Sequence, residues 1–447
     1  MQPTPIFRKI VTSSAIPWRI RNGLETWLEE KARERYPALY RWAHSGSWAD
    51  PVRALTEGPG HHFFGYYDKS PWNSSGRYLL AHEADFNDRA PNAQDSIRIG
   101  VVEPDEGRRF RPIAESHAWN WQQGAMLQWH PLDKERLVVY NERRDGRFVG
   151  IVRDVEGGEQ RTYERPIYAI LPDGTFAYSV SFARLATHRP GYGYAGVQDI
   201  FFDDPQPERD GVWRLDLSSG GSELMVSIAE LAARDPKRSM EGAWHYINHV
   251  QVSPTGKRIA FFHIWHRGDT PWEVRLYTCC HDGSDLRCML DTGFISHYDW
   301  RDDDTILVWA NRPQGKARFL MLSHLSEGFG VFAEASVRED GHCSYSPDGA
   351  WVLNDTYPDR FQMRTLMLIR TTDHKRIDIA RFYSPTTRWW GEIRCDLHPR
   401  WNGDGQRICI DSVHEGTRQM YSVDVARHVQ DAPNAPRHRQ EFSQGGR

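Results

Sequence analysis

Four histidines occupy the same position in four copies of a short sequence unit. In each copy the histidine precedes three residues of alternating character, a tight turn and a β-rich run. The copies begin HVQVSPTGKR (249–258), HYDWRDDDT (297–305), HCSYSPDGA (342–350) and HPRWNGDGQ (398–406). This pattern predicts a strand, a turn and a second strand. It assigns one equivalent position to His249, His297, His342 and His398.

Imidazoles gathered at one place could bind a metal ion. Burying several together is costly unless a metal or a charge partner satisfies them. Cys395 lies three residues before His398, and its thiolate could join the four histidines. Nitrogen and sulfur ligands favour Zn²⁺ over Mn²⁺ or Ca²⁺, so we expect zinc, mainly in a structural role. Because there are five candidate ligands, a catalytic role for the metal stays open. The alternative to a metal site is a hydrogen-bonded cluster of histidines that closes the channel, with Cys395 as a buried apolar side chain.

The spacing of the units indicates the architecture. The histidines are 48, 45 and 56 residues apart, close to the length of one four-stranded propeller blade. Weaker copies occur at 70–82, 129–140 and 170–180. We therefore predict an all-β fold, a seven-bladed β-propeller over residues 56–427, whose innermost strands bring the histidines to the central channel.

The two ends of the chain differ from the repeats. Residues 1–55 include apolar positions at helical spacing, which predicts a short N-terminal helical extension. Residues 428–447 are polar and proline-rich and are predicted to be a flexible tail.

Composition excludes several classes of function. The 447 residues carry a net charge of −4, whereas nucleic-acid binding demands a basic face. With 39% hydrophobic and 26% charged residues, the chain is not of a disordered type. There is no long apolar run and no recognisable signal peptide, so we expect no membrane span and a cytoplasmic location. Oligomeric state is left open.

Four segments resemble a known family. GHHFFGYYDKSPW (60–72), YINHVQVSPTGKR (246–258), GHCSYSPDG (341–349) and GEIRCDLHPRWNGDGQRICIDSVHEGTRQMY (391–421) are similar to seven-bladed propeller polysaccharide lyases of the ulvan lyase type. The similarity to oligogalacturonate lyases, which share the propeller and a central metal, is more distant. The resemblance implies cleavage of a uronate-containing polysaccharide or oligosaccharide by β-elimination.

The resemblance also implies catalytic residues. Ulvan lyases of this type use two histidines, a tyrosine and an arginine, and the best matches here are His62, His82, Tyr168 and Arg184. Elimination needs an arginine to neutralise the carboxylate, a base for the C5 proton and an acid for the leaving oxygen. His82 or Tyr168 is the expected base, Tyr168 or His62 the expected acid, and Arg184 the carboxylate ligand. His61 is an alternative to His62.

Two other functions remain possible at this stage. A non-catalytic propeller could bind glycan or protein in a polysaccharide biosynthesis pathway, because propellers host many binding functions. A hydrolase with two carboxylates could use Asp68 and Glu83, although no further residues support such a pair. Convergence of the four predicted catalytic residues in one groove would favour the lyase.

Overall fold

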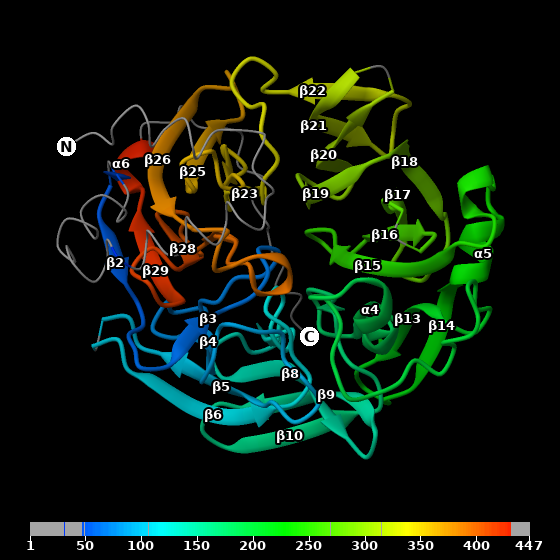
Figure 1. The fold of residues 1–447 in the computed structure, drawn as a ribbon, viewed down its shortest axis with the longest axis horizontal. Coiled ribbons are helices and arrows are strands. Elements are labelled where there is room, and N and C mark those ends of the chain that lie inside the picture. The colour runs from blue at the N-terminus through cyan, green and yellow to red at the C-terminus, as the bar shows by residue number, and fades with distance from the viewer. Residues whose placement is uncertain are drawn as a thin grey trace, which may run out of the picture.

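Seven antiparallel sheets are arranged as blades around a common axis in the computed structural model of the chain (Figure 1). The structure describes Lys31 and residues 47–48, 50–105, 107–268, 270–313 and 315–430. The predicted seven-bladed propeller is therefore confirmed. The predicted helical extension and tail lie almost wholly outside these described residues.

Blades 1 to 4 each contain four consecutive strands, ordered from the channel outward. Their bounds are β3 (His61–Phe63), β4 (Leu79–Ala84), β5 (Ile97–Val102) and β6 (Phe110–Ser116); β7 (Gln128–Trp129), β8 (Leu137–Arg144), β9 (Arg147–Asp154) and β10 (Gly158–Tyr163); β11 (Ala169–Ile170), β12 (Phe176–Ser179), β13 (Gly211–Asp216) and β14 (Ser222–Ser227); and β15 (Trp244–Val252), β16 (Arg258–His266), β17 (Glu273–Cys280) and β18 (Arg287–Gly293).

Blades 5 to 7 complete the ring. Their strands are β19 (Ile295–Trp300), β20 (Thr305–Arg312), β21 (Gly315–Ser323) and β22 (Phe329–Phe332); β23 (Ser344–Tyr345), β24 (Trp351–Asn354), β25 (Met363–Arg370) and β26 (Arg376–Tyr383); and β27 (Arg400–Trp401), β28 (Arg407–Ser412) and β29 (Gln419–Asp424). Short helices join or follow the strands: α4 (Phe182–His188), α5 (Ile228–Ala233), η1 (Arg238–Met240), η2 (Gly391–Ile393) and α6 (Ala426–Val429).

Two N-terminal strands join the C-terminal blades. β2 (Val52–Ala54) pairs with β29 as the outermost strand of blade 7, and β1 (Ser47–Trp48) pairs with β26 on blade 6. The chain ends therefore close the ring through backbone hydrogen bonds. β1 and β2 thus belong to the propeller sheets, although the sequence predicts that residues 47–48 and 52–54 lie in the N-terminal extension.

Apolar side chains fill the spaces between neighbouring sheets. The largest buried cluster runs from Ala118 in the approach to blade 2 to Leu322 on blade 5. Among the described helices, none has both the length and the apolar character needed to cross a bilayer.

One hydrogen bond recurs in every blade and defines the repeat. At the turn after the innermost strand, a backbone N–H donates to the carbonyl at the start of the next strand, over 2.8–3.0 Å; the donors are Asn73, His130, Leu171, Ser253, Arg301, Ser346 and Asn402. The residues four positions before these donors are Lys69, Met126, Ile167, His249, His297, His342 and His398. Blades 4 to 7 thus carry histidine at a position where blades 1 to 3 do not.

A buried ion pair on blade 7 holds the segment that follows β3. Arg400 and Asp411 lie on β27 and β28, 2.7 Å apart, and are 1% and 2% exposed. The Asp411 carboxylate accepts from the N–H groups of Phe64 and Gly65. The Arg400 guanidinium donates to the carbonyls of Gly65 and Tyr66. Blade 7 thereby satisfies backbone groups of the chain as it enters the channel.

Replacing Arg400 by methionine is expected to destabilise the fold strongly. The change leaves Asp411 as an uncompensated buried charge, which costs about 3–5 kcal/mol. Denaturant unfolding measures this loss. The matched control is R234M, because Arg234 pairs with Glu230 on the surface of α5 and its loss should cost about 0.3–0.5 kcal/mol. Equal stability of the two variants would contradict the anchoring role of Arg400.

Candidate metal centre

The four repeated histidines surround two tyrosines from blade 1. The Tyr66 ring lies 5.1 Å from His249 and 5.0 Å from His398, measured between centroids. The Tyr67 ring lies 5.3 Å from His342. His342 is in turn 4.1 Å from His297 and 4.4 Å from His398. The propeller axis is therefore packed with imidazole and phenol rings.

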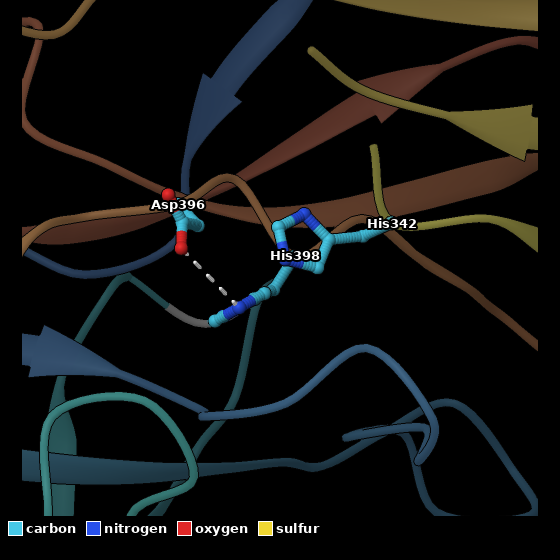
Figure 2. A group of neighbouring side chains, drawn as sticks. All are labelled: His342, Asp396 and His398. Atoms are coloured by element: carbon cyan, nitrogen blue, oxygen red, sulfur yellow. Dashed lines mark ion pairs between the residues drawn. The ribbon is translucent and has the colours of Figure 1, made fainter. Parts of the chain in front are cut away.

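Two of these histidines form a group with an aspartate that could hold a metal ion. One ligand atom each from His342, Asp396 and His398 lies within 4.8 Å of the others, and all three residues are buried. Figure 2 shows both imidazoles and the carboxylate directed toward one space, with Asp396 3.9 Å from Nε2 of His398. His342 comes from the segment before β23, and the other two precede β27.

The protonation of His342 suits a metal ligand. Its Nδ1 lies 2.9 Å from Asp355 Oδ1, and its own backbone N–H donates to the same carboxylate. Donation of the Nδ1 proton to Asp355 leaves the Nε2 lone pair free, as is usual for histidines that bind metals. Nε2 of His342 and Nε2 of His398 are both buried and have no hydrogen-bond partner among the described residues.

Burial keeps these imidazoles neutral. It lowers the pKa of His342, and it lowers the pKa of His398 well below the usual value, with a further contribution from His342. Neutral imidazole is the form that binds metal ions. Two buried, unpartnered nitrogens beside a carboxylate therefore fit a divalent cation.

Asp396 is held by two arginines. Arg364 and Arg394 each lie 2.7 Å from one of its oxygens. Although burial alone would raise it, these guanidinium groups hold the pKa of Asp396 well below its usual range. The carboxylate is thus ionised and shared between the arginines and the histidine pair.

The other predicted metal ligands lie outside this group. His249 stacks on Tyr66, and its Nε2 lies 3.3 Å from the Asn248 amide. His297 Nδ1 lies 3.0 Å from Asp340 Oδ1. Cys395 packs with Trp389 and Val413, and burial raises the pKa of its thiol to about 11.

The donor set does not select zinc. Cys395 supplied the sulfur that favoured zinc in the sequence, and it does not join the group. Two imidazoles and a carboxylate suit both Zn²⁺ and Mn²⁺. The structure therefore supports a candidate metal site, and the metal that it binds stays a prediction.

Backbone strain marks two of the histidines. His249 and His398 have φ angles of +55° and +42°. This left-handed conformation costs free energy for residues other than glycine. It persists where the surrounding structure fixes it, and it often occurs at functional sites. At His249 it coincides with a bulge between Asn248 and Gln251 in the pairing of β15 with β16.

The two predicted catalytic histidines point to opposite faces of blade 1. His62 pairs with Glu83, and Phe63 pairs with His82. Paired residues project to the same face and successive residues to opposite faces. His62 accordingly lies beside Glu83 and Gln419, whereas Nε2 of His82 accepts from the N–H of Ala125. Both are 2% exposed or less.

Tyr168 is a predicted catalytic residue that bonds to the backbone of His249, one of the four repeated histidines. Its hydroxyl accepts from Gln123 Nε2 at 2.6 Å and from the N–H of His249, and it donates to Asn248 Oδ1. Burial raises the pKa of Tyr168 well above 10, which disfavours a role as base.

All three guanidinium nitrogens of Arg184 bond to protein groups. Its guanidinium pairs with Asp199 at 3.0 Å and donates to four carbonyl groups, those of His245, Phe201, Asp204 and Pro205. Arg184 is 1% exposed. In this structure it anchors the 199–205 loop, and its predicted role as carboxylate ligand stays a prediction.

Sequence reasoning missed several members of the site. Asp396 is two residues before His398 in an irregular segment, so the alternation of a strand could not indicate the side on which its carboxylate lies. Tyr66 and Arg394 reach the site through folding between distant blades. The Arg394 guanidinium donates to the Tyr192 hydroxyl at 2.8 Å, and the Tyr192 ring lies 5.3 Å from His249.

The fold and site together define a seven-bladed propeller with a candidate metal centre on its axis. No protein-family model matches the chain, and no curated protein matches it. Among solved structures, oligogalacturonate lyase from Vibrio parahaemolyticus is similar, with a TM-score of 0.57 and 14% identity over 85% of this chain and 97% of that one. An oligogalacturonate lyase in complex with manganese has a TM-score of 0.60 and 14% identity, over 86% and 95%. At this identity the likeness establishes the shared fold.

Metal binding is expected to depend on His342 and His398. Purified protein should contain a divalent metal, and H342A and H398A should lose it because each removes a buried nitrogen ligand. D355N should weaken metal affinity by about 10- to 100-fold, since it disturbs the partner that orients His342. Elemental analysis and competition with chelators measure these effects.

The control for the metal experiment is H117A. His117 lies beside Glu142 with 41% of its side chain exposed, so its loss should leave metal content unchanged. Metal-free wild-type protein, or full metal content in both H342A and H398A, would contradict the assignment of the site.

Proposed function

We propose that this protein is a metal-containing lyase that cleaves a uronate-containing glycan by β-elimination. The observation that carries the proposal is the axial group of His342, Asp396 and His398 in a fold shared with oligogalacturonate lyases. One of those oligogalacturonate lyases is in complex with manganese. On the basis of the sequence resemblance described above, we further propose that the substrate is of the ulvan type and that the metal is Zn²⁺.

A metal held by His342, Asp396 and His398 would supply positive charge against the substrate carboxylate. Arg394 is the side chain best placed to assist it. Its guanidinium lies beside Asp396 and Tyr192, and its side chain is 20% exposed. An arginine paired to one carboxylate can still offer its remaining N–H groups to a second. Arg184 has no comparable freedom.

His297 is the proposed base. Its Nδ1 bonds to Asp340, and its ring lies 4.1 Å from the His342 ring. A carboxylate on one ring nitrogen orients the imidazole and leaves the other nitrogen to accept a proton. In the reaction this nitrogen would take the C5 proton as the C4–O bond breaks and the C4=C5 bond forms.

Tyr66 is the proposed acid. Its ring contacts His249 and His398, and burial raises the pKa of its hydroxyl well above 10. The hydroxyl is therefore protonated, as a group that protonates the leaving oxygen must be. Tyr168, the tyrosine indicated by the sequence resemblance, is the alternative acid, because its hydroxyl bonds to the backbone N–H of His249.

Incubation with uronate polysaccharides is expected to produce the ultraviolet absorbance of a conjugated C4=C5 product. The panel should include oligogalacturonate, ulvan and bacterial exopolysaccharides. H297Q should abolish the rise, and Y66F and Y168F distinguish the two candidate acids. No rise on any substrate by metal-loaded protein would contradict the proposed lyase.

Arginine variants separate a binding role from a structural one. R394M is expected to lower kcat/KM by about 10²–10³ with a near-normal Tm, because it removes charge stabilisation at the site. R184M is expected to lower Tm instead, because it leaves Asp199 unpaired in the interior. The opposite pattern would restore Arg184 as the carboxylate ligand.

A non-catalytic binding propeller is the second candidate function. It is favoured by the burial of His62, His82 and Arg184, which form no common groove in the described part of the chain. A protein that binds acidic glycans and its metal without turnover would support this function.

A further inference from the structure

Arg189 is a cation held between two aromatic rings at the edge of the candidate site. Its guanidinium carbon lies 5.1 Å from the centroid of Tyr192 and 5.1 Å from that of Trp272. The Tyr192 ring continues the stack to His249 at the axis. A row of side chains therefore leads from the histidines across Tyr192 and Arg189 to Trp272 on the blade 4 side.

The local sequence explains this arrangement. Arg189 ends α4, and its N–H donates to the carbonyl of Leu185. The next residues, Pro190 and Gly191, form a tight turn in which the N–H of Tyr192 donates to the carbonyl of Arg189. Gly191 has a φ of +93°, as the third residue of a type II turn requires. The turn folds Tyr192 back beneath the arginine, and Figure 1 places α4 between β13 and the propeller axis.

The charge of Arg189 lacks a counterion in the part of the chain that the structure describes. No carboxylate and no carbonyl accepts from its guanidinium there, and its polar contacts are to ring faces. The neighbouring Arg394, by contrast, pairs with Asp396. A guanidinium fixed by stacking presents N–H donors in a planar fork that matches a carboxylate or a sulfate.

We propose that Arg189, with Tyr192 and Trp272, forms a binding site for an acidic sugar next to the one held at the metal centre. The inference rests on the proposed function, because it takes the acidic glycan as ligand. The guanidinium would bind the carboxylate or sulfate of the sugar, and the rings of Tyr192 and Trp272 would hold the guanidinium in place. Arg189 is then a residue that determines specificity for an anionic neighbour, and it takes no part in proton transfer.

The test is calorimetric titration of the full-length protein with three oligosaccharides: an oligogalacturonate, its methyl ester and a sulfated uronate oligosaccharide. Wild type should bind an acidic probe and not the ester. R189M should weaken this binding by about 10- to 100-fold, the loss expected for a hydrogen bond to a charged group. R189K, which keeps the charge and loses the planar fork, should give an intermediate affinity. The better of the two acidic probes identifies the anion.

R165M is the matched control. Arg165 also stacks on an aromatic ring, Trp213, with its guanidinium carbon 3.3 Å from the centroid, and it bonds to Ser222. Its loss should leave affinity unchanged, and all variants should keep the wild-type Tm. Equal binding by R189M and wild type, equal binding of ester and acid, or no binding of either acidic probe would overturn the inference. Binding that depends on Arg189 without any ultraviolet product would support the site and reject the lyase.

Discussion

The pairing of Arg400 with Asp411 is the interaction on which the rest of the structure depends. Both charges are buried in blade 7, and they satisfy backbone groups of a segment from blade 1. A buried ion pair offsets the cost of removing its charges from water only when further hydrogen bonds satisfy the remaining donors and acceptors. Here those bonds fix the chain where it enters the channel, and so they fix Tyr66 among the histidines. The β2–β29 pairing closes the same seam from the outside.

The sequence was sufficient for the fold because the repeat is a local signal. Each of the four units has a histidine, a turn four residues later and then a strand, and the units recur at the spacing of one blade. The same turn hydrogen bond occurs in each of them, so the four aligned histidines occupy equivalent positions in their blades. The strand that closes the ring was harder to predict from the sequence. β2 is a strand of three residues whose partner β29 lies about the full length of the propeller away in sequence, and so short a strand has no recognisable pattern of its own.

The site was only partly predictable for a related reason. His342 and His398 follow from the repeat, but Asp396 and Arg394 belong to the irregular segment between blades 6 and 7. Cys395 was a plausible ligand by proximity in sequence, yet it packs into an apolar cluster while Asp396 turns toward the histidines. The orientation of such a segment is set by contacts with other blades, here Arg364 and Tyr192, which no local spacing reveals.

The closure of the ring also sets when the site can exist during synthesis of the chain. Tyr66 is made early, whereas His398 and Asp411 are made only after the strands of six blades, and β29 follows later still. A ribosome-bound or truncated chain therefore carries histidines without the partners that neutralise and orient them. The candidate metal group of His342, Asp396 and His398 therefore becomes possible only after the segment before β27 has been made, and Tyr66 packs against His398 once blade 7 lies beside blade 1.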